Sequence, residues 1–582
     1  MTGWGRFHQV RGHHLAPRKV GCNTPLMSST PPLGPLARRA RRAVALTLLV
    51  VAGTLAACSS SSSTSTTTTS VRTTNATVCH RPVTTVRATP VPGVAPDWDV
   101  TSFDGTVIRV HWFPLSTYAP GSGTGPHPTV LMGPGWSLPG DTDTTGQGIL
   151  GAVPIKDLLA AGYNVLTWDP RGFGRSAGSA EVDSAAYEGR DVSTLISWAA
   201  SRPGVQLDGP GDPRMGMVGG SYGGGIQLVT AATDCRIDAI VPTIAWHSLG
   251  TSLYKASTEK TGWSGILTNL SSTDHVDPVV LAAYASARAT GTITPAQEAW
   301  FLARGPGQSV HRITVPTLIV QGTVDTLFTL QEGVDNYEIL RAAGTPTAMQ
   351  WFCGGHGVCL TDPGNTAAPE RATLAWLERY VQKDASVDTG AGFSFVDQNG
   401  TTYSAPSYPL PRGVPFVATG SGSLSLVATG GSGPITAAPG GQQLGSLVTP
   451  ITPSPATNAV DVPVPVTRSG VVVGAPRLLL TYHGTVPAHD RPTRVFAQLV
   501  DTSTGLVLGN QVTPVAVTLD GRTHSTSLPL EIVAYTATPS SRVELQLVAT
   551  TVAYATPQLG GSVTFSSVHV TLPVASSLTP AG

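Results

Sequence analysis

Between residues 100 and 385 the chain alternates short apolar runs with amphipathic stretches. Apolar runs of four or five residues predict buried strands, and apolar residues recurring every three or four positions predict helices. Asp104-Gly105 between two apolar runs predicts a hairpin at the start. The alternation predicts a mostly parallel sheet with helices on both faces. The expected strands are 129–132, 164–168, 215–218, 239–242, 317–320 and 348–352, and the expected helices are 155–161, 191–200, 225–232 and 370–381.

Residues 246–312 interrupt this alternation with polar, helix-prone sequence. An insertion between late strands lies over the strand tips, so it is predicted to form a helical cap. After about residue 390 the helical patterns vanish, and short β-rich runs recur between Gly, Ser, Thr and Pro turns; 393–396 is the first of them. These runs predict a C-terminal β-sandwich or jelly roll.

The first 58 residues have the pattern of an export signal. Arg38–Arg42 is positively charged, and the apolar run Ala43–Leu55 that follows is too short for a comfortable membrane span. The run ends in Leu55-Ala56-Ala57-Cys58, which resembles a bacterial lipobox with Cys58 as the lipidated residue. An ordinary signal peptide or a single anchor helix are the alternatives.

A polar tether follows the signal, because residues 59–70 are almost entirely Ser and Thr and cannot pack. A start at Met27 instead of Met1 would leave a leader of ordinary signal length. The predicted order is a lipoprotein-type signal, a tether with an N-terminal arm, a hydrolase domain with its cap, and a β-sandwich domain. Their predicted bounds are 1–57, 58–90, 91–385 (cap about 246–312) and 386–582.

The net charge of the chain limits the classes of partner that it is expected to bind. The 582-residue chain has a net charge of zero, and only 12% of its residues are charged. Nucleic acid requires a basic footprint, so it is not an expected partner. The expected partners are a small ester, amide or peptide substrate and, through the lipid anchor, a membrane.

Four cysteines lie beyond the signal: Cys79, Cys235, Cys353 and Cys359. An even number in an exported chain favours disulfides. Cys353–Cys359 would close a small loop around His356, and Cys79–Cys235 would then tie down the N-terminal arm. A metal site is the rival interpretation, but the spacing is wrong for a zinc ribbon and no histidine cluster accompanies it. No metal or cofactor is expected.

Gly219-Gly220-Ser221-Tyr222-Gly223 carries the strongest chemical signal in the chain. It follows an apolar run and opens a helix-like segment, and strand, sharp turn and helix are the context in which G-x-S-x-G forms a nucleophile elbow. The turn lifts the serine hydroxyl to the top of the sheet. A glycine-rich turn without function is the alternative. The context favours Ser221 as the nucleophile of a serine hydrolase.

An elbow serine needs a base, and the base needs an acid that orients it, in the chain order Ser, Asp or Glu, His. Asp325 follows a predicted strand about a hundred residues after Ser221, which leaves room for the cap. His356 lies after the last predicted strand, between glycines that let the imidazole reach the serine. The other histidines after Asp325 occupy strand-rich sequence and are expected at the surface; they are His483, His489, His524 and His569.

The oxyanion of an acyl-transfer reaction needs two donors. The backbone N–H of Tyr222, directly after the nucleophile, is the first candidate. The second should come from the loop after the strand 129–132, where Trp136 N–H is preferred because Pro134 has no N–H. The glycine-rich segment 169–176 lacks the lysine spacing of a phosphate loop and is predicted to be a structural loop beside the site.

Together these motifs resemble the X-prolyl dipeptidyl-peptidase and cocaine-esterase group of α/β-hydrolases. The segments that carry the resemblance are 169–176, 219–224, 321–325 and 354–357. The resemblance covers roughly residues 95–575 and implies an α/β-hydrolase fold with a short helical cap and an all-β jelly roll after it. It implies Ser221, Asp325 and His356 as the triad and Tyr222 N–H as an oxyanion donor. In that family a tyrosine hydroxyl often supplies the second donor, and Trp136 stands there here.

The expected function is an extracytoplasmic serine hydrolase that cleaves an ester or an amide through an acyl-enzyme. An X-Pro dipeptidyl-peptidase proper is the alternative. A third interpretation, from another class, is a non-catalytic surface lipoprotein that binds glycan or protein. The complete set Ser221, Asp325 and His356 argues against the third, because loss of activity usually removes one member.

Overall fold

The computed structural model describes residues 85–580, apart from 120, 122–124, 149–151, 273, 437–446 and 489. The predicted signal segment, Cys58, the Ser/Thr tether and Cys79 lie outside these residues, as does His489. Within the described ranges, no helix combines the length and the apolar character that a membrane span requires.

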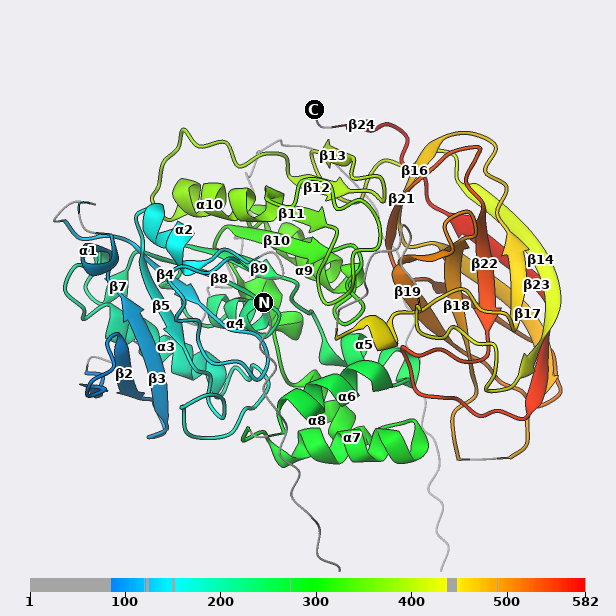
Figure 1. Ribbon diagram of the computed structural model, residues 1–582, viewed down its shortest axis with the longest axis horizontal. Helices are drawn as coiled ribbons and strands as arrows, with labels where there is room; N and C mark the ends of the chain where they lie inside the picture. The colour runs from blue at the N-terminus through cyan, green and yellow to red at the C-terminus, as the bar shows by residue number, and fades with distance from the viewer. Residues whose placement is uncertain are drawn as a thin grey trace, which may run out of the picture. The chain divides into compact units, whose positions relative to one another are not determined.

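One large sheet organises the hydrolase part (Figure 1). Its central strands, from β5 to β12, run parallel, and antiparallel strands extend it at both edges. The parallel strands are apolar along most of their length because helices cover both faces. The strands, in spatial order, are β1 (Ala88–Pro90), β2 (Asp97–Thr101), β3 (Val107–Phe113), β5 (Asn164–Trp168), β4 (Thr129–Met132), β8 (Met215–Gly220), β9 (Ala239–Thr243), β10 (Thr317–Gly322), β11 (Thr347–Phe352), β12 (Phe393–Val396), β13 (Thr402–Ala405) and β24 (Thr579–Pro580).

The two faces of the sheet carry separate apolar cores. Residues of α3 (Glu188–Ala199), α4 (Tyr222–Ala231) and α9 (Leu330–Ala343) build the core on one face. Residues of α1 (Leu115–Tyr118), α2 (Ile155–Ala160) and α10 (Ala368–Tyr380) build the other. The α/β-hydrolase fold class is confirmed. A two-stranded ribbon, β6 (Leu207–Gly209) with β7 (Asp212–Pro213), lies outside this sheet.

The stretch between β9 and β10 is helical, and its helices pack on one another (Figure 1). Local signals set their ends: the Asp277 carboxylate accepts from Val279 N–H, and Thr294 and Gln297 form a capping box. Gly291, with φ +78°, ends the helix that Asp277 begins. The elements are α5 (Leu249–Leu253), η1 (Lys255–Ser257), α6 (Thr261–Leu270), α7 (Pro278–Thr290), α8 (Pro295–Leu302) and η2 (Gly307–Arg312).

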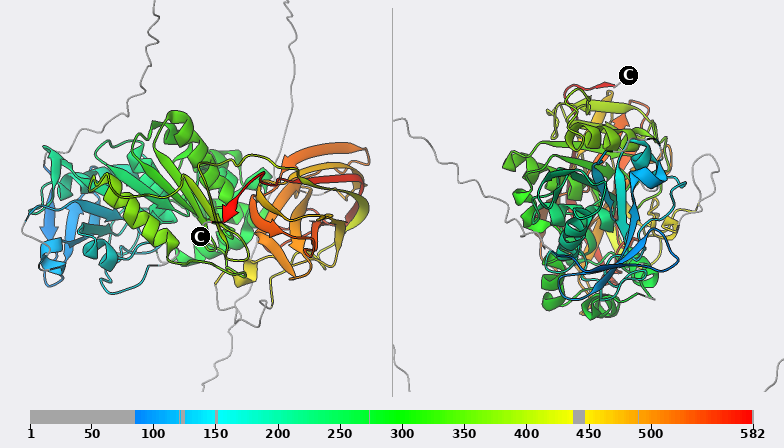
Figure 2. Two further views of the ribbon diagram at one scale, coloured as in Figure 1. Left: turned by 90° about the horizontal axis from the view of Figure 1, so that it is seen from above. Right: turned by 90° about the vertical axis from the view of Figure 1, so that its left-hand side faces the viewer.

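The C-terminal part is a sandwich of two four-stranded antiparallel sheets with its own apolar core (Figures 1 and 2). One sheet has the order β14 (Phe416–Leu426), β23 (Gly561–Leu572), β17 (Arg477–Thr485) and β20 (His524–Pro529). The other has the order β15 (Ala459–Pro463), β22 (Val543–Val548), β18 (Arg494–Asp501) and β19 (Leu506–Ala516). The remaining elements are η4 (Thr449–Ile451) and the pair β16 (Gly470–Gly474) and β21 (Val533–Ala537). The predicted all-β second domain is thus confirmed.

One expectation about the second domain is wrong. Phe393–Val396 was grouped with the sandwich strands, but as β12 it pairs in parallel with β11. β13 then adds to β12, and the last strand, β24, adds to β13. Phe393 and Phe395 of β12 pack on Trp351 of β11, and these aromatic contacts stabilise β12 as an extension of the large sheet. The sandwich strands therefore begin only at β14.

Candidate active site

Ser221 lies in a strained turn between β8 and α4. Its φ of +59° and ψ of −118° place it in a region that a serine rarely adopts. Gly219 and Gly223 make the turn possible: a Cβ on either residue would collide with the backbone of Gly133 after β4. The elbow predicted from the sequence is present.

Asp325 and His356 converge on this serine. His356 Nε2 lies 2.8 Å from Ser221 Oγ, and His356 Nδ1 lies 2.7 Å from Asp325 Oδ2. Each side chain comes from the end of a different strand, β8, β10 or β11, and the carboxyl ends of parallel strands meet at one edge of the sheet. The structure therefore brings together the three residues that the sequence selected.

The Asp325 carboxylate is fully buried and accepts hydrogen bonds at both oxygens. Oδ1 accepts from the backbone N–H groups of Leu327 and Phe328, at 3.0 and 2.8 Å. Oδ2 accepts from His356 N–H at 3.1 Å, in addition to its contact with the imidazole. These donors fix the carboxylate so that it can orient the histidine ring.

His356 lies in the segment 353–359, called here the histidine loop, and two aromatic rings pack against its imidazole. Trp263 of α6 and Phe328 stand edge-on to the His356 ring, with centroids 5.7 and 5.1 Å away. A disulfide joins Cys353 and Cys359. Gly355, at φ +99°, lets the loop approach the Asp325 side chain, where a Cβ would collide.

The Cys353–Cys359 bridge is expected to support activity more than global stability. Closing so short a loop stabilises the fold by about 2 kcal/mol in the chain-entropy model, whereas a base displaced by about 1 Å loses up to about a hundredfold in rate. Reduction with dithiothreitol, or Cys353→Ser with Cys359→Ser, should therefore lower kcat about tenfold while moving Tm by only a few degrees. Parallel thermal melts and ester hydrolysis measure both effects. A kcat that is unchanged on complete reduction would contradict this role.

Cys235 follows α4 within the described chain, but Cys79 does not lie within it. The Cys79–Cys235 pairing therefore stays a prediction. Of the histidines expected at the surface, His483 is exposed and His524 and His569 are partly exposed, all on sandwich strands.

The oxyanion donors are arranged around the start of α4. Tyr222 is the first residue of that helix, so its N–H has no acceptor within the helix and is available to a ligand. The Trp136 ring packs edge-on against the Tyr222 ring, with centroids 5.3 Å apart. The Trp136 indole N–H donates to Leu267 O of α6 at 3.2 Å, so this residue also anchors the cap. A role of Trp136 N–H as the second donor stays a prediction.

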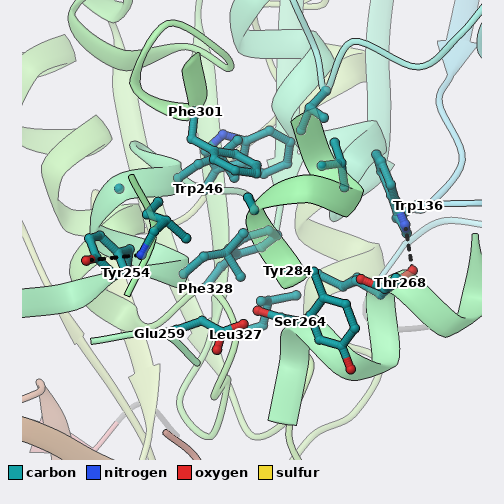
Figure 3. Close-up of a pocket in the computed structure, with 18 of the residues that line it drawn as sticks. Trp136, Trp246, Tyr254, Glu259, Ser264, Thr268, Tyr284, Phe301, Leu327 and Phe328 are labelled. Carbon is teal, nitrogen blue, oxygen red and sulfur yellow. Dashed lines mark hydrogen bonds between the residues drawn. The ribbon is translucent and has the colours of Figure 1, made fainter. Parts of the chain in front are cut away.

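Ser221 is one of the residues that line a pocket between the strand ends and the cap, and Figure 3 shows most of the side chains around this pocket. Its wall is largely aromatic and aliphatic, which suits a bulky apolar group next to the nucleophile. Sequence reasoning expected a cap here but selected only Trp136 among these residues, since single apolar residues look like ordinary core. They include Trp136, Trp246, Leu249, Leu253, Tyr254, Leu267, Tyr284, Phe301, Leu327 and Phe328.

Two acidic residues, Glu259 and Glu298, line this pocket, and sequence reasoning missed both; Glu259 is the buried one. It precedes α6 and is only 4% exposed. Its Oε2 accepts from Thr261 Oγ1 at 3.1 Å, but Oε1 has no hydrogen-bond partner in the described part of the chain. Burial raises the pKa of this carboxyl. A lone Glu in a polar stretch offers no sequence signal, because only the folded cap removes it from water.

The loop 169–176 is structural, as predicted. The Asp169 carboxylate accepts from the backbone N–H groups of Gly140 and Arg175, at 2.8 and 2.7 Å. The Arg171 guanidinium forms a buried ion pair with Asp191 at 2.7 Å. Phe173 packs on Trp136 and Tyr222. Because Arg171 is already paired with Asp191, it is not available to bind a phosphate. The loop instead shapes the pocket wall.

Two further carboxyls lie behind Tyr222. Glu188 accepts from the N–H groups of Glu181 and Ser184, at 2.6 and 2.8 Å, and lies 3.4 Å from the Tyr222 hydroxyl. Asp183 is fully buried, and its backbone N–H donates to that hydroxyl at 3.2 Å. Burial raises the pKa of Glu188 to about 7 and that of Asp183 well above its usual value.

The raised pKa of Glu188 predicts that the free energy of unfolding depends on pH. Its folded pKa of about 7 exceeds the ordinary value of 4.5, so the folded state binds more protons between these values. The contribution of Glu188 to stability is therefore lost as pH rises from about 4.5 to 7. The free energy of unfolding of Glu188→Gln, measured relative to that of the wild type, should therefore be higher at pH 8 than at pH 4.5 by on the order of 3 kcal/mol. Urea unfolding at both pH values tests this, with Glu378→Gln on an exposed position of α10 as the control. A pH-independent difference for Glu188→Gln would argue that the carboxyl is ionised throughout.

Comparison with known proteins gives one family match and several similar structures. The model of the X-Pro dipeptidyl-peptidase family (S15) matches residues 104–357, which include Ser221, Asp325 and His356. An uncharacterized 31.7 kDa protein of Escherichia coli, from the traX-finO intergenic region, is 34% identical over 86 residues, or 15% of this chain. The chain spans only 28% of the length of that relative.

Solved structures resemble nearly the whole fold, sandwich included. A CocE/NonD family hydrolase from Staphylococcus aureus has a TM-score of 0.56 at 12% identity, over 82% of this chain and 93% of its own. An α-amino acid ester hydrolase has a TM-score of 0.57 at 12% identity, over 88% of this chain and 100% of its own. At such identities these two structures establish the fold alone. The family match over residues 104–357 supports a serine hydrolase whose hydrolase part is similar to the X-Pro dipeptidyl-peptidase family (S15), and the two structures show that the fold resembles that of a CocE/NonD hydrolase.

Proposed function

We propose that this protein is an extracytoplasmic hydrolase that cleaves an ester or amide bond through an acyl-enzyme on Ser221. The observation that carries the proposal is the continuous hydrogen-bonded chain from Ser221 Oγ through His356 to the buried Asp325, at the floor of an apolar pocket.

The proposed mechanism follows from this chain. His356 Nε2 takes the proton of Ser221 Oγ as the oxygen bonds to the acyl carbon, and Asp325 stabilises the resulting imidazolium. The oxyanion accepts from Tyr222 N–H and, we propose, from Trp136 N–H. His356 then gives the proton to the leaving group. Water, deprotonated by the same histidine, releases the acid and restores Ser221.

The pocket favours an ester with a bulky apolar acyl group. A panel of p-nitrophenyl esters with acyl groups from acetate to phenylacetate and octanoate, set against X-Pro-p-nitroanilides, tests this. We expect kcat/KM to rise with the apolar size of the acyl group. A fluorophosphonate probe should label Ser221 in the same protein. Absence of both labelling and turnover would contradict the proposal and favour the surface-binding alternative.

Glu259 favours a second candidate, a substrate whose acyl part carries an ammonium group, as in an X-Pro dipeptide or an amino-acid ester. Glu259 Oε1 is buried with no hydrogen-bond partner among the described residues, and a bound cation would offset the cost of its desolvation. The name of the α-amino acid ester hydrolase that shares the fold is consistent with such a substrate.

Matched substrates separate the two candidates. If Glu259 binds an ammonium group, Glu259→Gln should lower kcat/KM for p-nitrophenyl 2-aminobutyrate about 10- to 100-fold, because a hydrogen bond to a charged group is lost. The same variant should hydrolyse p-nitrophenyl butyrate within about twofold of wild type, and this ester is the internal control. Equal losses on both esters would mean that Glu259 acts only on the structure of the cap.

We also propose export and lipid anchoring at Cys58. The support is the sequence Leu55-Ala56-Ala57-Cys58 before a Ser/Thr tether. A diacylglyceryl group with an N-acyl chain would hold the protein at the membrane surface. Mass spectrometry of the mature N-terminus tests this: an unmodified first residue other than Cys58 would exclude the anchor.

A further inference from the structure

One sandwich strand, β19, departs from regular pairing next to the active site. Its partner β18 pairs Gln498 with Val512 and then Val500 with Val507. Leu508–Gln511 of β19 therefore stand opposite the single residue Leu499. Gly509 and Asn510 adopt φ values of +62° and +58°, which turn the backbone out of the sheet. Bulges of this kind re-aim side chains, and they concentrate next to active sites.

The bulge directs two side-chain amides at the hydrolase part. Asn510 Nδ2 donates to Val358 O at 2.8 Å, and Gln511 Nε2 donates to Asp325 O, also at 2.8 Å. Both residues are buried, at 5% and 6% exposure. The Gln511 bond is itself buried, so loss of that amide would leave a buried carbonyl without its donor, whereas the Asn510 bond is partly buried.

These two carbonyls belong to the loops that form the triad. Asp325 carries the acid, and Val358 lies two residues after His356, inside the loop closed by the disulfide. The bulge thus bonds to the acid loop (residues 323–329) and to the histidine loop at once. The separation of these loops sets the 2.7 Å contact between Asp325 and the imidazole.

Other contacts join the sandwich to the acid loop. Glu531, just before β21, accepts from Thr329 Oγ1 at 2.9 Å and forms an ion pair with Lys255 of the cap. The buried Lys260 Nζ donates to Thr326 O and Leu327 O of the same loop, both at 2.9 Å, and lies 6.0 Å from the Tyr554 ring centroid. The sandwich therefore meets the acid loop at more than one point.

We propose that Asn510 and Gln511 are positioning residues for the reaction, and that the β-sandwich completes the active site by holding the acid and histidine loops in register. The proposal rests on the function proposed above. Neither amide touches the substrate pocket; each acts through the backbone of a triad loop. Packing the sandwich against the hydrolase part would not by itself require a bulge here. Directing two amides at the two triad loops does require one.

The test uses variants that remove each amide with little change of shape. Asn510→Gly keeps the left-handed backbone without strain, and Gln511→Met keeps the length of the side chain. Because a triad displaced by about 1 Å loses up to about a hundredfold in rate, kcat for a p-nitrophenyl ester should fall about tenfold in each variant and more in the double variant. KM should stay within about twofold, since the pocket is unchanged. The rate of fluorophosphonate labelling should fall with kcat.

Gln498→Met is the matched control. Gln498 is a buried amide of β18 that bonds to Ser454 O and Gln546 within the sandwich, away from the triad. It should lower Tm as much as the test variants and leave kcat unchanged. If all three variants lose Tm alike while kcat is unchanged, the amides are ordinary packing contacts and the positioning role is wrong. Ser221→Ala separates this result from failure of the proposed function, because activity that survives Ser221→Ala would overturn the function itself.

Discussion

Ser221→Ala is expected to lower kcat for ester hydrolysis on the order of 10⁴- to 10⁶-fold while the protein stays folded. The Ser221 hydroxyl is the atom that would form the acyl-enzyme, and its hydrogen bond is to His356 Nε2. The fold should tolerate the change, because the Ser221 side chain makes no capping bond to α4. Initial rates on a p-nitrophenyl ester, with circular dichroism and Tm measured in parallel, test both statements.

His569→Ala is the control for this experiment. It removes an imidazole from β23 of the sandwich, so turnover should stay within about twofold of wild type. Intact-mass spectrometry adds a direct readout: a fluorophosphonate adduct should form on wild type and on His569→Ala, but not on Ser221→Ala. Near-normal hydrolysis by Ser221→Ala would refute the covalent mechanism.

Asp325→Asn should cost about 10³- to 10⁴-fold in kcat, the second largest loss expected here. Every group around the Asp325 carboxylate is a donor: two backbone N–H groups at Oδ1, and the His356 backbone and ring at Oδ2. An amide has only one oxygen, so its NH₂ must face donors on one side. Either the loop is disturbed or the histidine takes the wrong tautomer.

Asp234→Asn is a control of similar burial for this substitution. Asp234 lies after α4, is 1% exposed and pairs with Arg236 at 2.6 Å, away from the triad. Both substitutions should lower Tm, but only Asp325→Asn should lower kcat by orders of magnitude. A loss of kcat for Asp325→Asn no larger than for Asp234→Asn would mean that Asp325 is structural.

Local patterns in the sequence were sufficient to predict most of the hydrolase part. The strand and helix periods located β4, β5, β8 and the helices that cover them, because each such element buries a face that its own residues define. The nucleophile elbow was predictable for the same reason: its strand, glycines and helix lie within a few residues of each other. The acid and the histidine followed from chain order, since both lie directly after strands that end at one edge of the sheet.

Long-range contacts decided the rest. Phe393–Val396 has the same local pattern as a sandwich strand, and only its packing on Trp351 assigns it to the large sheet as β12. Glu259 lies in a polar stretch of sequence, and it is a buried pocket residue only because the folded cap packs around it. Asn510 and Gln511 lie far along the chain from the loops they hold, so no local pattern connects them. The sequence by itself determined which residues form the candidate triad, because that depends on short segments. The tertiary structure decided what supports and surrounds them, because that depends on which distant segments pack together.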